Sequence, residues 1–258
     1  MTQSTPKTLI IGASGGIGQA ITKSLSAQGR SLILCGRSHS SLDKMSAGMN
    51  SIELLEADIT TQDGRAVITK RMQQNDIDTL INLAGINEMS AFTTQSPESI
   101  ERIINTNLTS TMLLTHSILA ISDKQKNLSI INVGSTLGAI GIPGYVTYCA
   151  SKFALRGFCQ ALSRELADTA IKIKYFAPRT TETSMNSDTA NAMNQELGNK
   201  ADSAEHVASQ LLDFIKSSAD NLHIGWPEKL FVKINGAFPS VVSKSLKKQL
   251  PIIQKYID

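Results

Sequence analysis

Ser135, Tyr148 and Lys152 lie within one short stretch of this 258-residue chain and could form a single reacting centre. Tyr148 and Lys152 are four residues apart, so they share one face if the segment is helical. A phenol beside an ammonium group can exchange a proton, and a nearby serine hydroxyl can hydrogen-bond an oxyanion. The same pair is also typical of a solvated helix face, because the chain holds 25 lysines and arginines. The surrounding elements have to decide between these interpretations.

Short apolar runs predict strands around this stretch, at residues 8–11, 31–35, 52–55, 77–83, 128–133, 171–176 and 222–224. Ser135 directly follows the strand at 128–133, and Tyr148 is expected to open a long helix. Further helices are expected at 97–121 and 204–216, and a polar, patternless stretch at 180–202 is expected to act as a lid. Alternation of strand and helix predicts an α/β fold: a single-domain, doubly wound parallel sheet, Rossmann-like, with helices on both faces.

The turn after the first predicted strand contains Gly12, Ser14, Gly16, Ile17 and Gly18. It connects a buried strand to the start of an amphipathic helix. Free backbone N–H groups and the positive end of the helix face such a turn, and glycine lets a pyrophosphate approach closely. The pattern favours a dinucleotide site, and the alternative is an ordinary tight turn.

The residues that follow the next two strands would contact the adenosine part of a dinucleotide. Arg37 and Ser38 follow the second strand, where an acidic residue would bind a ribose 2′-hydroxyl. An arginine fork can instead hold a 2′-phosphate, which favours NADP(H) over NAD(H); the alternative is a solvated loop residue. Asp58 and Ile59 follow the third strand, where Asp58 can reach the adenine amino group or cap a helix beginning near Thr61.

The fourth predicted strand ends in Ala84 and Gly85, small residues that let the backbone lie against a cofactor. Asn82, within that strand, is expected to have a structural role between neighbouring strands. Asn107 lies in the middle of the predicted helix at 97–121, where propensity disfavours asparagine. Its position indicates a kink, a water site or a function.

In this order, the residues resemble the short-chain dehydrogenase/reductase family in its common single-domain form, over roughly residues 8–225. The cofactor-loop glycines of that family fall on Gly12, Gly16 and Gly18. Its four catalytic positions fall on Asn107, Ser135, Tyr148 and Lys152. Its segment for the nicotinamide carboxamide falls on Pro178 and Thr183.

Two departures from the family pattern matter, one before the first glycine and one after Pro178. Ile11 stands where the family has a threonine before the first glycine, which should weaken one loop contact. Arg179 stands where the family has a glycine after the proline, and Thr181 replaces a branched apolar residue. Arg179 could therefore touch a cofactor phosphate or an anionic substrate.

The resemblance implies hydride transfer between nicotinamide and a carbonyl or alcohol, with Tyr148 and Lys152 also contacting the cofactor. Tyr148 would be the acid or base, and Lys152 would lower its pKa from the ordinary value near 10. Ser135 would bind the developing oxyanion, and Asn107 would hold a water that links Lys152 to solvent. The expected preference for NADP(H) favours reduction over oxidation. The pocket is expected to be formed by segments 87–94 and 137–145 and by the lid, and these segments favour a medium-sized apolar ketone or aldehyde as substrate. The alternative from another class is a nicotinamide-binding sensor or scaffold without turnover.

Bulk properties narrow the remaining possibilities. Three cysteines without a Cys-x-x-Cys pair, and residues 1–7 without an apolar signal core, predict a reduced, cytoplasmic protein. Four scattered histidines predict no metal site. The net charge of +3 comes from the C-terminal end, so we expect no nucleic-acid partner for the rest of the chain. A homodimer or homotetramer is expected.

Residues 226–258 form a basic extension beyond the catalytic region, which we assign to residues 1–225. Apolar residues recur at helical spacing from Val242 onward, with lysines among them and Pro251 as an interruption. One interpretation is a helix packed on the same domain or at an oligomer interface. The other is an amphipathic surface that meets a membrane or admits a lipid-like substrate.

Overall fold

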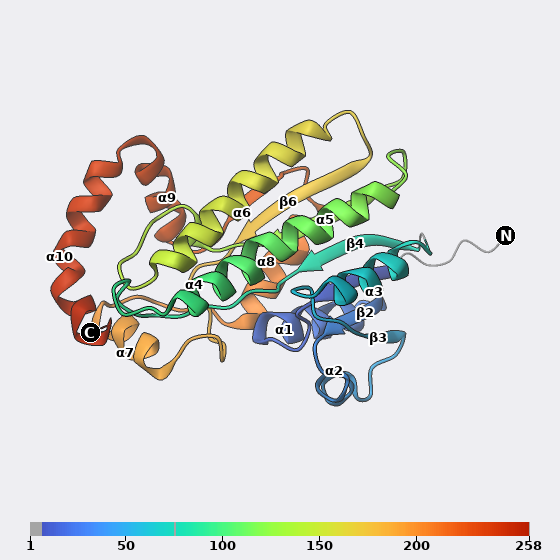
Figure 1. The fold of residues 1–258 in the computed structure, drawn as a ribbon, viewed down its shortest axis with the longest axis horizontal. Coiled ribbons are helices and arrows are strands. Elements are labelled where there is room, and N and C mark those ends of the chain that lie inside the picture. Colours follow the sequence, from blue (N-terminus) through green and yellow to red (C-terminus); the bar gives the residue numbers. More distant parts are fainter. Residues whose placement is uncertain (1–6, 75, 258) are drawn as a thin grey trace.

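The computed structural model describes residues 7–74 and 76–257, and a seven-stranded parallel sheet forms its centre (Figure 1). The N-terminal segment 1–6 considered above therefore lies outside the described residues. The strands are β1 (Lys7–Ile11), β2 (Ser31–Gly36), β3 (Ile52–Glu56), β4 (Ile77–Asn82), β5 (Leu128–Val133), β6 (Ile171–Ala177) and β7 (Asn221–His223). Their order is β3-β2-β1-β4-β5-β6-β7. The predicted doubly wound α/β fold is confirmed.

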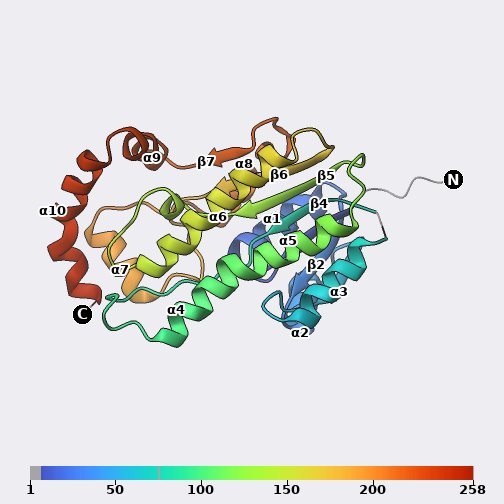
Figure 2. The ribbon, with the colours of Figure 1, turned by 45° about the horizontal axis from the view of Figure 1, so that its top comes forward.

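Helices cover both faces of the sheet (Figure 2). They are α1 (Gly16–Ala27), α2 (His39–Ser46), α3 (Gln62–Met72), α4 (Pro97–Ile104), α5 (Ser110–Ile121), α6 (Val146–Glu165), α7 (Asp188–Glu196), α8 (Ala204–Lys216), α9 (Glu228–Ala237) and α10 (Pro239–Ile257). Apolar side chains of α3, α5 and α6 form the core on one face, and those of α1 and α8 form it on the other. None of the helices within 7–74 and 76–257 is long and apolar enough to cross a bilayer.

The strand register brings the candidate site together at one edge of the sheet. Ile11 of β1 lies level with Cys35 of β2 and with Asn82 of β4, and Asn82 lies level with Asn132 of β5. The chain order reverses between β1 and β4, which is where open parallel sheets place their ligands. The turns that follow β1, β2, β4 and β5 therefore meet at the same edge.

The predicted helix at 97–121 is continuous but irregular. It consists of α4, a π-helical segment at Asn105–Thr109, and α5. A π-helical turn inserts one extra residue and is frequent at functional sites. It surrounds Asn107, the residue whose helix position is disfavoured by propensity, and so explains the irregularity that the sequence indicated there.

The stretch 180–202 differs from the sequence-based expectation. It contains a regular helix, α7, where the sequence was expected to have no pattern. The Ser187 side chain accepts a hydrogen bond from Ala190 N and caps the first turn. Ala190 and Met193 are buried on one side of α7. Two anchoring side chains are too few to stand out as a periodic pattern in the sequence, which is why the helix was missed.

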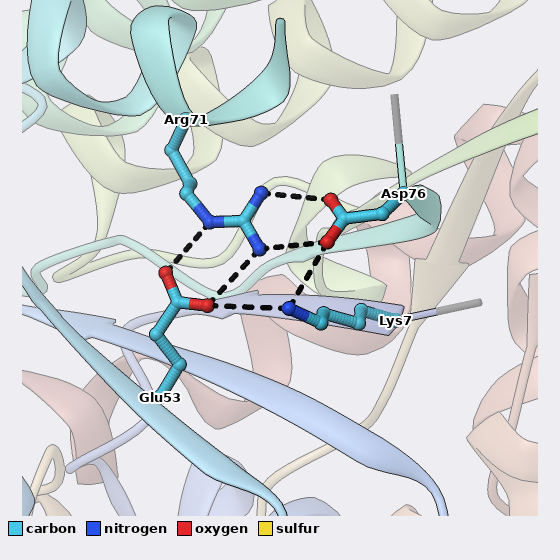
Figure 3. A network of polar contacts seen from close by, with 4 residues as sticks. All are labelled: Lys7, Glu53, Arg71 and Asp76. Atoms are coloured by element: carbon cyan, nitrogen blue, oxygen red, sulfur yellow. Dashed lines mark hydrogen bonds and ion pairs between the residues drawn. The ribbon is translucent and has the colours of Figure 1, made fainter. Parts of the chain in front are cut away.

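The opposite edge of the sheet, at the amino ends of the strands, contains an ion-pair network (Figure 3). The Arg71 side chain is 6% exposed and donates to both carboxylate oxygens of Glu53 (2.6 and 3.0 Å) and of Asp76 (2.8 and 3.1 Å). Lys7 lies 3.0 Å from Asp76. Hydrogen bonds from Arg71 lower the pKa of Asp76 to about 2 and also lower the pKa of Glu53. The network connects α3 to the starts of β1, β3 and β4.

This network predicts acid-sensitive stability. Carboxylates with a lowered folded pKa stabilise the fold above their unfolded pKa near 4, and this contribution is lost as the pH falls towards about 2. Arg71→Met should therefore cost about 2 kcal/mol near pH 7 and should reduce the dependence of stability on pH below about 4. Urea unfolding at several pH values measures both effects.

Arg102→Met is the matched control, because it removes a pair with Glu88 in which the arginine side chain is 65% exposed. We expect a change below about 1 kcal/mol there. An unchanged pH dependence in Arg71→Met would contradict the assigned role of the network.

Candidate active site

Ser135, Tyr148 and Lys152 lie together beyond the carboxyl end of β5 and in the first turns of α6. Each is at most 9% exposed. Lys152 Nζ lies 5.7 Å from the centroid of the Tyr148 ring. The Tyr148 hydroxyl is hydrogen-bonded to the Ser135 side chain, and Ser135 Oγ accepts from Leu137 N at 3.1 Å. Because the Tyr148–Lys152 pair is buried, the solvated-helix interpretation of this pair is wrong.

The Lys152 ammonium is held inside the protein by backbone. Its Nζ donates to the carbonyl oxygen of Val133, the last residue of β5, at 3.1 Å. A Cβ atom on Gly85 would lie 3.3 Å from the same Nζ, so glycine at this position leaves room for the ammonium. Burial lowers the pKa of Lys152 to about 8. The group is therefore still mainly protonated near neutral pH.

Burial affects Tyr148 in the direction opposite to the sequence-based expectation. It raises the pKa of the phenol above its ordinary value, and the hydrogen bond to Ser135 offsets only part of this rise. The expected lowering of the Tyr148 pKa by Lys152 is not found in the chain by itself. Tyr148 is therefore a protonated phenol, suited to give a proton rather than to take one.

Asn107 links the π-helical segment to the turn after β4. Its side chain is fully buried, accepts from Ile86 N at 2.8 Å and donates to Ile86 O at 2.9 Å and Ser151 Oγ at 3.0 Å. Its Oδ1 and Lys152 Nζ both lie beside Gly85. Asn107 thus positions the backbone of this turn next to the lysine.

Tyr175, in β6, is a site residue that the sequence analysis missed. Its side chain is fully buried, and its hydroxyl donates to Ser135 O at 3.2 Å and accepts from Ser135 N at 3.4 Å. A Cβ atom on Gly134 would overlap its ring, and a Cβ atom on Gly138 would overlap its hydroxyl. The two glycines on either side of Ser135 were the only signal in the sequence that a large side chain approaches this turn.

The glycine-rich turn after β1 fits a dinucleotide phosphate. Gly12 has a φ of +78°, which favours glycine, and a Cβ atom on Gly18 would overlap the carbonyl of Gly12. The first N–H bond of α1 runs from Gln19 to Gly15 O at 2.8 Å. Residues 16–18, including Ile17, therefore have N–H groups without helical partners, and they face the turn.

The other predicted adenosine contacts surround this turn. Ser14 is exposed, and its Oγ lies 3.7 Å from where a Cβ on Gly36 would be. Arg37 is exposed at the end of β2, while Ser38 Oγ accepts from Ser41 N and caps α2. The structure thus leaves the Arg37 guanidinium available to a phosphate.

The residues after β3 have a local role as well. Asp58 Oδ1 accepts from the backbone N–H and the hydroxyl of Thr60, at 2.8 and 2.7 Å. Thr61, not Asp58, caps α3, so the capping interpretation of Asp58 is wrong. Ile59 is buried beside it, and its carbonyl accepts from Arg65 at 2.7 Å.

The turns after β4 and β6 complete the edge. Ala84 N donates to the Asn82 side chain at 3.1 Å, and Asn82 Nδ2 donates to Asn132 Oδ1 at 3.2 Å, a structural role between strands. Pro178 is buried, and its carbonyl accepts from Thr136 N at 2.9 Å. The Thr183 side chain lies directly against Gly16: a Cβ atom there would be 2.7 Å from Thr183 Cγ2. The stretch 180–202, which we call the lid segment, therefore contacts the glycine-rich turn at 12–18, which we call the phosphate turn.

Arg179 is paired with two acidic side chains of this chain, and its two roles considered from the sequence remain predictions. It donates to Asp202 Oδ1 at 2.6 Å, to Glu228 Oε2 at 3.2 Å and to Trp226 O at 3.0 Å. Its side chain is 12% exposed. The guanidinium thus connects the end of the lid segment to the start of α9.

The C-terminal helix α10 forms part of the wall beside Tyr148. Ile253 is fully buried and belongs to one apolar cluster with Tyr148 and with Met193 of α7. Glu196 of α7 accepts hydrogen bonds from Lys255 and Tyr256 of α10. Helices α7 and α10 are therefore joined by both apolar and polar contacts. They lie beside a site in which Ser135, Tyr148 and Lys152 are almost fully buried.

Fold and site together define a Rossmann-like α/β protein with a phosphate turn at its switch point and a buried serine–tyrosine–lysine centre. The sequence model of the short chain dehydrogenase family matches residues 7–194. The chain belongs to this family and is an oxidoreductase.

Relatives of known name support this assignment. Nodulation protein G of Rhizobium meliloti (strain 1021) is 34% identical over 182 residues, which cover 69% of this chain and 74% of that protein. The 3-oxoacyl-acyl-carrier-protein reductase FabG of Escherichia coli (strain K12) is 33% identical over 180 residues, with the same coverage.

Solved structures show the same fold. A short-chain dehydrogenase from Sphingobium yanoikuyae in complex with NADPH has a TM-score of 0.77 and 25% identity, covering 92% of this chain and 95% of that one. A short-chain dehydrogenase from Burkholderia cenocepacia J2315 in complex with NADP has a TM-score of 0.81 and 21% identity, covering 95% and 99%.

The position of Tyr175 predicts a positioning role. Tyr175→Phe removes the hydroxyl that accepts from Ser135 N, while Ser135 O keeps its hydrogen bond from Gly138 N. The buried N–H of Ser135 loses this partner, which should cost about 1–3 kcal/mol of stability. The variant should also lower kcat roughly tenfold with little change in KM, because Ser135 loses its fixed orientation. Urea unfolding and steady-state kinetics measure the two effects.

Phe176→Leu is the matched control, since Phe176 is equally buried but packs on the opposite face of the sheet. It should lower stability and leave kcat unchanged. If Tyr175→Phe also left kcat unchanged, the residue would be purely structural.

Proposed function

We propose that this chain is an NADP(H)-dependent oxidoreductase that reduces the carbonyl group of an apolar ketone or aldehyde. The observation that carries the proposal is the joint burial of Tyr148, Lys152 and Ser135 at the switch-point edge, with the Lys152 ammonium 5.7 Å from the Tyr148 ring centroid. A sensor or scaffold without turnover has no need for a buried phenol and ammonium at this edge, so it is the weaker alternative. NADP(H), when bound, would supply or accept the hydride.

We propose that the phosphate turn and Arg37 hold the dinucleotide. N–H groups of residues 16–18 would bind the pyrophosphate, and Gly12 and Gly18 provide the close approach. Asp58 and Ile59 would border the adenine, and Ala84, Gly85, Pro178 and Thr183 the nicotinamide half. The NADPH and NADP complexes of the structural relatives support this assignment.

Tyr148 acts as the general acid in this proposal. Its raised pKa keeps the phenol protonated near neutral pH, so it can donate its proton to the carbonyl oxygen of the substrate. Lys152, charged below about pH 8, stabilises the phenolate that remains. Ser135 donates a hydrogen bond to the same substrate oxygen, because Leu137 N occupies its acceptor side. Asn107 holds the turn beside Lys152 and would place a water that returns protons from solvent.

The apolar wall indicates the substrate class. Met193, Leu197, Ile253 and Ile257 surround Tyr148 and carry no charge. A medium-sized apolar carbonyl compound fits such a wall, and FabG, one of the relatives, is named for a reductase of 3-oxoacyl groups. We assign this activity to residues 1–225 and treat 226–258 as an extension that completes the substrate side.

We further propose a homodimer or homotetramer, which sedimentation velocity of the purified chain would measure. Large apolar side chains lie exposed on the neighbouring helices α5 and α6: Met112, Leu113, Val146 and Phe153 are each more than 40% exposed. A second copy covering these helices would bury them.

The acid role of Tyr148 predicts the effect of removing one oxygen atom. Tyr148→Phe should lower NADPH turnover with a panel of ketones and aldehydes by at least about a hundredfold, because the proton donor is lost. NADPH affinity, measured by fluorescence titration, should remain within a few-fold. Tyr145→Phe, a buried tyrosine three residues away, is the control and should keep its turnover. Substantial turnover by Tyr148→Phe would overturn the mechanism.

The exposed guanidinium of Arg37 predicts the cofactor preference. The ratio of kcat/KM for NADPH to that for NADH should fall roughly 10- to 100-fold in Arg37→Ala, because a hydrogen bond to a charged group contributes about 1.5–3 kcal/mol. Lys44→Ala removes an exposed positive charge from the adjacent α2 and should leave the ratio unchanged. A ratio that is insensitive to Arg37 would assign the preference to another residue.

A further inference from the structure

The start of the C-terminal extension carries a group of exposed apolar side chains that catalysis does not use. Trp226 is 64% exposed, Phe238 is 65% exposed and Val241 is 58% exposed, and Leu230 and Phe231 of α9 are 39% and 46% exposed. All five lie within sixteen consecutive residues. Single exposed apolar residues need no explanation, but a group of this size marks a binding surface. We call these five residues the aromatic patch.

The aromatic patch includes residues of α9 and of the segments at its two ends, and α9 is firmly attached to the domain. Glu228 pairs with Arg179, Val232 packs against Ala139 and Ile140, and the Asn235 side chain donates to Ala139 O at 2.8 Å. Glu228, Val232 and Asn235 follow each other at helical spacing and define the inner face of α9. Leu230 and Phe231 therefore belong to an anchored helix, Trp226 lies just before it, and Phe238 and Val241 follow at its junction with α10.

The segment that follows Glu228 and carries most of the aromatic patch is basic. Residues 229–257 contain six lysines and no aspartate or glutamate. Five of these lysines form no ion pair within the described part of the chain: Lys229, Lys233, Lys244, Lys247 and Lys248. Lys229 Nζ lies 6.0 Å from the ring centroid of Trp226. Lysines beside an exposed tryptophan are typical of a helix that lies at a membrane interface.

The patch also lies at a suitable end of the molecule. Figures 1 and 2 show α9 and α10 together at one end of the molecule, beyond the main body of the sheet. The far end of α10 packs beside Tyr148 through Ile253. The basic, apolar surface and the substrate side of the candidate active site therefore share the same end of the protein.

We propose that the aromatic patch docks onto an anionic lipid bilayer, with Trp226 and Phe238 entering the interface and the surrounding lysines contacting lipid phosphates. Lipid phosphates neutralise the lysines, whereas a two-fold contact with a second copy would bring the same lysines face to face. The contact is peripheral and does not require turnover, so it stands independently of the reductase function.

Trp226 is the only tryptophan of the chain, so its fluorescence reports directly on the patch. The full-length protein should bind vesicles of phosphatidylcholine mixed with phosphatidylserine, with a blue shift of the emission, and should bind pure phosphatidylcholine far less. Added salt should weaken the binding. Absence of binding to both kinds of vesicle, or equal binding to both, would overturn the proposal.

Two double variants identify the surface in a vesicle sedimentation assay. Trp226→Ser with Phe238→Ser, and Lys229→Gln with Lys233→Gln, should each lower the partition coefficient roughly tenfold or more. The matched control is Lys23→Gln with Lys70→Gln, which removes the same charge from exposed sites on α1 and α3 and should bind nearly as wild type.

The remaining outcomes are also decisive. Partition coefficients equal to wild type in both patch variants would overturn the proposal. A second copy is the other possible occupant. A blue shift that grows with protein concentration without vesicles, together with an oligomer that Trp226→Ser dissociates in sedimentation velocity, would assign the patch to that interface and reject the membrane.

Discussion

The buried ammonium of Lys152 is the constraint on which the rest of the site depends. A charge inside a protein requires hydrogen-bonding partners, and here the carbonyl of Val133 provides one at 3.1 Å. The fold must therefore end β5 at that carbonyl, start α6 so that Lys152 points inward, and leave Gly85 without a side chain above the ammonium. The π-helical segment around Asn107 serves the same centre, because it brings an amide to the turn that covers it.

The two edges of the sheet have different roles: the amino-end edge stabilises the fold, and the carboxyl-end edge carries the candidate site. At the amino ends, Arg71, Glu53, Asp76 and Lys7 pair with one another in one network of opposite charges. At the carboxyl ends, the phosphate turn keeps backbone N–H groups without helical partners, and the Arg37 side chain is exposed. Polar groups that are paired within the chain stabilise the fold, whereas polar groups without a partner in the chain can bind a ligand.

Local patterns in the sequence were sufficient for most of the architecture. The strands end within about two residues of the predicted positions because short apolar runs bounded by glycine and polar residues are local signals. The four-residue spacing of Tyr148 and Lys152, and the glycine turn, likewise place their groups through local geometry alone.

The contacts that were missed connect distant parts of the chain. Tyr175 reaches Ser135 across 40 residues, and Arg179 reaches Glu228 across 49. No periodicity reports such a pairing. The raised pKa of Tyr148 belongs to the same group, because burial is a property of the assembled fold and outweighs a neighbouring lysine that the sequence does show.

Arg179 connects the C-terminal extension to the lid segment. One guanidinium holds Asp202 at the end of the lid segment and Glu228 at the start of α9. Any displacement of α9 changes the free energy of the lid, and any opening of the lid changes that of α9 by the same amount, since coupling between two sites is reciprocal. A ligand bound beside the lid segment and a partner bound at α9 would therefore be linked through the two elements that this single side chain joins.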